Sequence, residues 1–184
     1  MTQFVNNPYY VQYERLLEEL SHLMAEGKGD TDEADAIRDE MDVPWYKLSQ
    51  EETDRMRGVS ADLYMLQDDE VYESYKGTQE ELRAALSEAL GRNDYEAILA
   101  LLRKGTSFLR PVQVASLRGR CYAALGHPDT ALLFLRYAAA HDPDRAAYRV
   151  AVLDLLLKLH RPDDALAEAE TCLQTVEEPL LLAA

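Results

Sequence analysis

The sequence predicts an all-α protein, in which a solenoid of paired helices over residues 78–184 follows an acidic helical module over residues 1–77. Three observations predict this fold. Apolar and polar residues do not alternate over any sustained run, as they would in half-buried strands. Apolar residues instead recur at helical spacing between capping residues and Gly or Pro breaks. In the second part of the chain, a pattern of helix pairs recurs every 34 residues.

The first predicted helix begins at Asn7-Pro8. Asn is a good N-cap, and proline fits the first helical position because its missing N–H needs no partner there. The apolar residues that follow at helical spacing are Tyr13, Leu16, Leu17, Leu20, Leu23 and Met24. Gly27 is the predicted end, because glycine readily adopts the left-handed conformation that closes a helix.

Capping boxes predict the starts of the next two helices. Asp30 with Glu33 opens a short second helix, which Val43-Pro44 is expected to end. Ser49 with Glu52 opens a third helix that continues to Leu66.

Trp45 and Tyr46 lie in the segment between the second and third helices. Aromatic residues beside a proline commonly pack a corner, so we expect both to hold the second helix against the third. The alternative is an exposed aromatic anchor for a partner protein.

Six helices are predicted in the second part of the chain. Thr78 with Glu81 caps the first of them. The others are expected near residues 94–104, 111–125, 128–141, 145–159 and 162–176. Because the connections are short, neighbouring helices should be antiparallel.

Three alanines, Ala97, Ala131 and Ala165, are spaced 34 residues apart and divide the chain into units over 78–111, 112–145 and 146–179. In the middle unit, Gly119 and Ala131 are small enough to let two helix backbones meet. That unit resembles the signature of the tetratricopeptide repeat (TPR) family, which it matches at Gly119, Tyr122, Gly126, Ala131, Leu135, Ala138 and Pro143. The outer units match less fully.

The resemblance implies a protein-interaction scaffold or adaptor, since repeats of this family bind a peptide or a helix in a groove lined by their first helices. Transferred to this sequence, the groove residues are Gln113, Ser116, Arg120, Ala147, Val150, Asp154 and Lys158. The expected ligand is another protein or peptide. A non-catalytic subunit of an enzyme complex remains an alternative.

Charge restricts the partners further. The net charge is −15, and residues 1–77 account for −12 of it, with 19 Asp and Glu against 7 Lys and Arg. Such a surface repels nucleic acid and anionic lipid, so we expect neither nucleic acid nor a membrane as a partner. The acidic module would attract a basic protein or peptide, as an acidic inhibitor or antitoxin would. The other interpretation is that the acidic residues only keep the protein soluble.

An apolar stripe on the last helix suggests a further contact. Its members are Leu166, Ala169, Cys172, Leu173 and Val176. A repeat array normally ends in a helix with a polar outer face, so we expect a second copy or a partner to cover this stripe, giving a possible homodimer through the C-terminal helix.

No motif for catalysis occurs. There is no HExxH, no cysteine pair at zinc spacing and no glycine-rich phosphate loop, so we expect no enzyme activity, no metal and no cofactor. Cys121 and Cys172 are interpreted as core residues in a reducing compartment. With no leader or membrane span recognised, the expected location is cytoplasmic. The segment around Trp45 weakly resembles segments of bacterial proteins of unassigned function, which suggests a bacterial origin.

Overall fold

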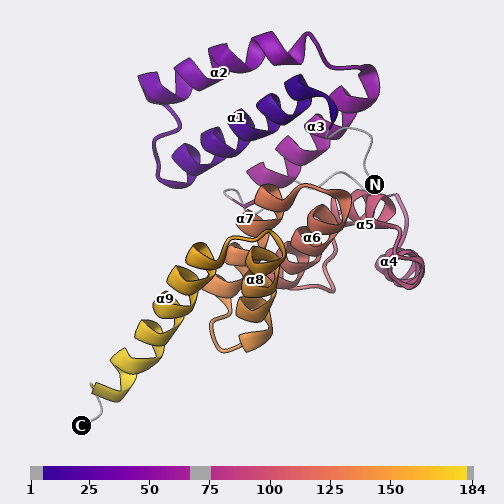
Figure 1. Cartoon of the computed structure of the whole chain (residues 1–184). Coiled ribbons are helices and arrows are strands. Elements are labelled where there is room, and N and C mark those ends of the chain that lie inside the picture. Colours follow the sequence, from indigo (N-terminus) through magenta and orange to yellow (C-terminus); the bar gives the residue numbers. More distant parts are fainter. Residues whose placement is uncertain (1–5, 67–75, 182–184) are drawn as a thin grey trace. The chain divides into compact units, whose positions relative to one another are not determined.

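The structure, a computed structural model, describes residues 6–66 and 76–181, with the backbone alone for 172–181. Within these residues helices are the only regular secondary structure, which confirms the all-α prediction (Figure 1). The chain divides by its contacts into two compact units, Met1–Thr106 and Ser107–Ala184. The predicted boundary between residues 77 and 78 rests on the lapse of helical apolar spacing and the change in charge balance over residues 67–77, and it stays a prediction.

The first unit contains five of the helices. They are α1 (Pro8–Ala25), α2 (Asp32–Trp45), α3 (Gln50–Tyr64), α4 (Gln79–Arg92) and α5 (Tyr95–Leu102). Helix α1 packs against α2 and α3, and α4 packs against α5. Three of the apolar positions predicted on the first helix, Leu16, Leu17 and Leu20, belong to the core of this unit, as do Met56 and Val59 of α3.

Most helix starts are as the sequence predicts. The Asn7 side chain accepts a hydrogen bond from the Tyr9 N–H, and complete capping boxes form at Ser49 with Glu52 and at Thr78 with Glu81. These caps were predictable because each one involves residues only two or three positions apart.

Helix α2 differs from its prediction at both ends. Its N-cap is Thr31, whose Oγ1 accepts from the Ala34 N–H, so the predicted cap at Asp30 is wrong. Its end is also later than expected, because the helix passes through Pro44 to Trp45. A proline one residue from the end removes only a single intrahelical hydrogen bond. The Pro44 ring is buried, and this packing favours the longer helix.

Trp45 packs as expected, but Tyr46 does not. The Trp45 ring lies 5.1 Å from the Tyr13 ring of α1, and the Arg57 guanidinium of α3 lies 5.6 Å from its centroid. Trp45 therefore joins the end of α2 to both neighbouring helices. Tyr46 is 80% exposed, so the expectation that it packs the corner is wrong.

Helix α3 is also joined to α5 by ion pairs. The Arg103 guanidinium donates two hydrogen bonds to the Asp62 carboxylate, at 2.9 and 2.8 Å, and Asp62 is completely buried. Gly58 makes room for this arginine, since a Cβ at residue 58 would lie 2.7 Å from Arg103 Nη2. A second pair joins Arg55 to Glu96. The first unit thus combines an apolar core with a buried charge pair.

The second unit contains α6 (Pro111–Leu125), α7 (Pro128–His141), α8 (Ala146–Lys158) and α9 (Pro162–Leu181). Each helix packs against the next one along the chain. A core cluster joins α7, α8 and α9; its buried members are Leu132, Leu135, Val152, Leu156 and Ala165. The bounds of α6, α7 and α8 agree with the predicted ranges to within one residue, while α9 extends further than predicted.

The α6–α7 pair is close where the sequence predicts it to be. A Cβ built on Gly119 would lie 2.7 Å from Leu135 Cγ and 3.1 Å from the Ala131 carbonyl oxygen. Tyr122 stacks on Phe134 with ring centroids 5.5 Å apart, and both rings are fully buried. The small side chains therefore let the two backbones approach, as expected.

The repeat period is less regular than the alanines suggest. The loops between paired helices each contain a residue in the left-handed conformation: Asn93, Gly126 and His160, spaced 33 and then 34 residues apart. Counted from these loops, Ile98 and not Ala97 corresponds to Ala131, and Ile98 is the buried one of the two. The first pair is thus shifted by one residue from the predicted register.

Candidate functional site

Helix α6 carries three of the predicted contact residues. It starts at Pro111, and the Gln113 side-chain oxygen accepts the Arg110 N–H at 2.9 Å, so Gln113 is used in capping the helix. Ser116 is half-buried. Arg120 is exposed and makes no hydrogen bond or ion pair with any residue that the structure describes. Of the three, Arg120 is therefore the side chain most accessible to a ligand.

Helix α8 carries the other four, and all of them are exposed. They are Ala147, Val150, Asp154 and Lys158. The Lys158 ammonium donates to the Asp154 carboxylate at 2.6 Å, so these two charges neutralise each other one turn apart. Val150 is 60% exposed, although it is a large apolar residue in the middle of the helix. No hydrogen bond or ion pair links the predicted residues of α6 to those of α8.

The structure adds two residues to this surface that were not predicted. Leu157 is 58% exposed, seven residues after Val150 and on the same side of α8. Arg149 is half-buried and has no hydrogen bond or ion pair within the described part of the chain. The apolar spacing along α8 could have revealed Leu157. The missing partner of Arg149 depends on the tertiary structure, and no sequence pattern indicates it.

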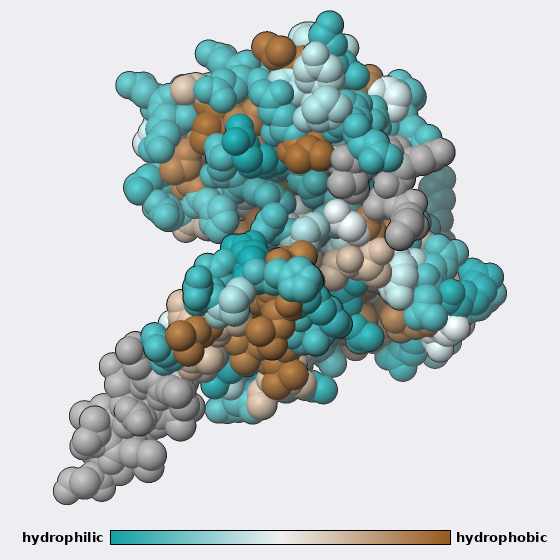
Figure 2. All heavy atoms as spheres, viewed as in Figure 1, coloured by the Kyte–Doolittle hydropathy of each residue, from teal (hydrophilic) through white to brown (hydrophobic). Residues whose placement is uncertain are grey.

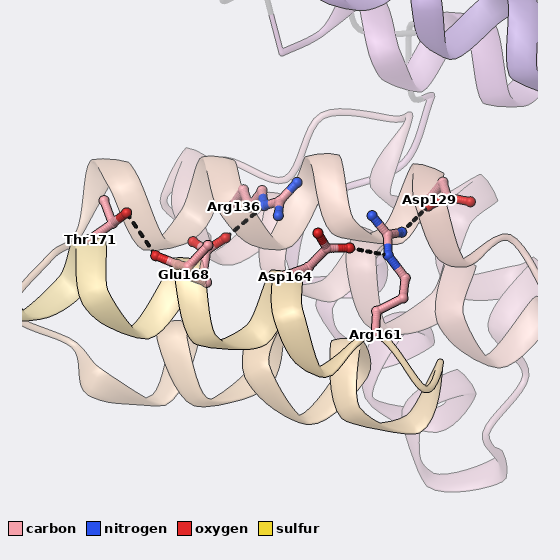
Figure 3. Close-up of polar contacts among 7 residues, drawn as sticks. Asp129, Arg136, Arg161, Asp164, Glu168 and Thr171 are labelled. Atoms are coloured by element: carbon pink, nitrogen blue, oxygen red, sulfur yellow. Dashed lines mark hydrogen bonds and ion pairs between the residues drawn. The ribbon is translucent and has the colours of Figure 1, made fainter.

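The charges between α7 and α9 are instead satisfied within the unit (Figure 3). Arg161 donates to Asp129 at 2.7 Å and to Asp164 at 2.5 Å, while Arg136 donates to Glu168 at 2.9 Å. The bond to Asp164 is the main cause of a raised pKa for Arg161, which burial opposes. These pairs hold α9 to α7, so they do not indicate a ligand.

In the first unit, the outer side of α2 is strongly acidic. Its six acidic residues are all exposed: Asp32, Glu33, Asp35, Asp39, Glu40 and Asp42. The one basic residue of this helix, Arg38, donates to Asp35 and to the Gly29 carbonyl oxygen. Val43 and Tyr46, at the end of the helix, are 63% and 80% exposed. An acidic surface with an accessible aromatic ring thus exists on this unit.

The apolar stripe predicted on the last helix is described only at its start. Leu166 is 60% exposed and Ala169 is half-buried. Cys172, Leu173 and Val176 lie outside the residues whose side chains are described. Cys121 is buried, as predicted.

Among the described residues, no three His, Cys, Asp or Glu side chains are grouped so that they could hold a metal ion. Nor does any described helix have the length and apolar character needed to cross a membrane. Comparison of the chain with protein-family models, with curated proteins and with solved structures finds no match.

Proposed function

We propose that this protein is a non-catalytic scaffold or adaptor, and that a partner protein or peptide binds to the exposed faces of α6 and α8. The observation that carries the proposal is the exposure of Val150 and Leu157 on one side of α8. Exposed apolar residues grouped on one face commonly mark a site of protein interaction. Arg120 on α6 adds an accessible cation that is not neutralised within the described chain.

The architecture supports the same proposal. The second unit consists of consecutive helices, each packed on the next, with a tight α6–α7 pair built on Gly119. Consecutive helices packed in this way also occur in TPR-like solenoids, and this is why we extend the proposal to that family. In such arrays the first helix of each pair lines the ligand groove, which here corresponds to α6 and α8. The proposed location is the cytoplasm of a bacterium.

The proposal is tested by affinity capture from bacterial lysate with the full-length protein as bait. Arg120→Glu and Val150→Asp alter the proposed surface, while Leu166→Asp alters an equally exposed leucine on α9. We expect a protein that is retained by the wild type and the Leu166 variant and lost by the other two. Capture of the same proteins by all four baits would contradict the proposal.

A second candidate is the sequestration of a basic protein by α2, as an inhibitor or antitoxin would do. Its support is the row of exposed acidic residues that ends at the accessible Tyr46 ring. Binding by this surface would fall steeply with ionic strength, because exposed charges are screened. Asp39→Lys with Glu40→Lys should abolish it, whereas Val150→Asp should leave it unchanged.

A further inference from the structure

The exposed side of α8 carries apolar residues with the spacing of a helix–helix seam. Ala146, Val150, Leu153 and Leu157 follow one another at intervals of four, three and four residues. This is the period with which one helix packs along another. Leu153 also contacts the core cluster, whereas Val150 and Leu157 remain more than half exposed. Figure 2 shows hydrophobic side chains gathered over this helix.

Charged residues border the seam at the positions that select a partner helix. If Val150 and Leu157 occupy position a of a heptad, Leu153 occupies d, Arg149 falls at g and Asp154 at e. In a parallel pair of helices, a g residue faces the e residue that lies five positions further along the other helix. Arg149 and Asp154 are five positions apart and opposite in charge. The seam is therefore complementary to itself.

We propose that a second copy of this chain binds here, with the two α8 helices parallel and Arg149 of each copy paired with Asp154 of the other. Three observations favour a second copy over an unrelated helix. Arg149 has no ion pair within the described residues. The Asp154 side chain is 58% exposed, and its bond to Lys158 leaves carboxylate lone pairs available. Val150 at a, followed by Leu153 at d, favours a two-stranded arrangement, whereas Leu157 at the next a position is not β-branched.

The interface would be two-fold symmetric, so each contact occurs twice. It is also short, because the seam from Ala146 to Leu157 extends over fewer than two heptads. The dimer is therefore expected to be weak, with a dissociation constant in the micromolar range or above. Self-association would cover Val150 and Asp154, so the second copy and another protein would compete for α8.

The inference goes beyond the proposed function, because it concerns the purified chain without any partner. Sedimentation equilibrium of the full-length protein, from low micromolar to submillimolar concentration, measures it directly. We expect the average mass to rise from 20.8 kDa towards twice that value. Val150→Asp should remove this rise, while Leu166→Asp, on α9, should preserve it. Circular dichroism checks that each variant remains helical.

Charge reversal tests the parallel pairing. Arg149→Asp and Asp154→Arg each place like charges opposite one another, and each should weaken the dimer about tenfold or more. The double variant restores the pair with its signs exchanged, and it should recover most of the lost affinity. A failure of the double variant to recover would overturn the proposed pairing.

Two other results would overturn the proposal as a whole. One is a monomer at every concentration, which would leave the binding of a different protein to α6 and α8 unaffected. The other is a dimer that Leu166→Asp dissociates and Val150→Asp does not, which would place the contact on α9.

Discussion

Gly119 of α6 lies directly against Leu135 of α7, so closely that a Cβ on the glycine would be 2.7 Å from the leucine Cγ. The Ala131 carbonyl oxygen would be almost as near, at 3.1 Å. A leucine side chain can shift its rotamer, but a backbone carbonyl within a helix moves only if the helix moves with it. Residue 119 therefore determines how closely α6 and α7 pack.

Gly119→Ala is accordingly expected to destabilise the protein by about 1–3 kcal/mol through overpacking. The matched control is Gly91→Ala in α4, where a Cβ would meet nothing within 4 Å. Alanine is the better helix former, so this change should stabilise by up to about 1 kcal/mol. Urea unfolding of the two variants should give effects of opposite sign. Equal effects would contradict the close packing at Gly119.

The buried ion pair between Asp62 and Arg103 gives a second prediction. Asp62→Ala removes both hydrogen bonds between the mostly buried Arg103 guanidinium and this carboxylate, and the free energy of unfolding is expected to fall by up to about 3 kcal/mol. Glu88→Ala removes an exposed pair with Arg92 and should change stability by less than about 0.5 kcal/mol. Thermal unfolding of the two variants and of the wild type measures both changes in stability. If Asp62→Ala and Glu88→Ala reduced stability by similar amounts, the Asp62–Arg103 pair would not contribute specially to the stability of the first unit.

Glu52 makes the stability of the first unit depend on pH. Burial alone would raise the pKa of this carboxyl group. Hydrogen bonds from the Ser49 N–H and from the Asn7 side chain outweigh burial and leave the pKa below its ordinary value of 4.5. Because the pKa of Glu52 is lower in the folded protein than in the unfolded chain, ionised Glu52 stabilises the fold. This contribution is complete above pH 4.5 and is lost as the pH falls through the lower, folded-state pKa.

Glu52→Gln should therefore reduce stability at pH 7 by about 1–2 kcal/mol, and the difference from the wild type should shrink below pH 4. Glu81→Gln is the matched control. Glu81 forms the same capping box at Thr78, but it is exposed and has no contact like that of Glu52 with Asn7. Glu81→Gln should therefore reduce stability at pH 7 by less than Glu52→Gln does. A difference for Glu52→Gln that grows at low pH would contradict this interpretation.

The sequence predicted best those features that depend on neighbouring residues. The caps at Asn7, Ser49 and Thr78 involve residues two or three positions away, and the bounds of α6 to α8 follow from Gly and Pro positions. The close contact at Gly119 was predictable because the spacing of small residues indicated which helix faces meet.

Features that depend on the tertiary structure were missed. The Asp62–Arg103 pair joins residues 41 positions apart, and no local pattern indicates it. The exposure of Tyr46 and the continuation of α2 through Pro44 depend on how α2 meets its neighbours. The predictions that Tyr46 packs the corner and that Val43-Pro44 ends the helix are both wrong. The one-residue shift at Ile98 follows from the loop at Asn93, which an exact 34-residue count does not reveal. In the candidate site, the sequence predicts the contact residues on α8, which are exposed, but it does not predict that Arg149 lacks an ion pair among the described residues.

The central claim is that the exposed faces of α6 and α8 bind another protein, and site-specific photo-crosslinking tests it most directly. A photoreactive residue in place of Ala147, an exposed residue of α8, should give an adduct with a different protein, identified by mass spectrometry. The same residue in place of Leu166 on α9 should not give that adduct. No adduct from position 147, or the same adduct from both positions, would contradict the claim.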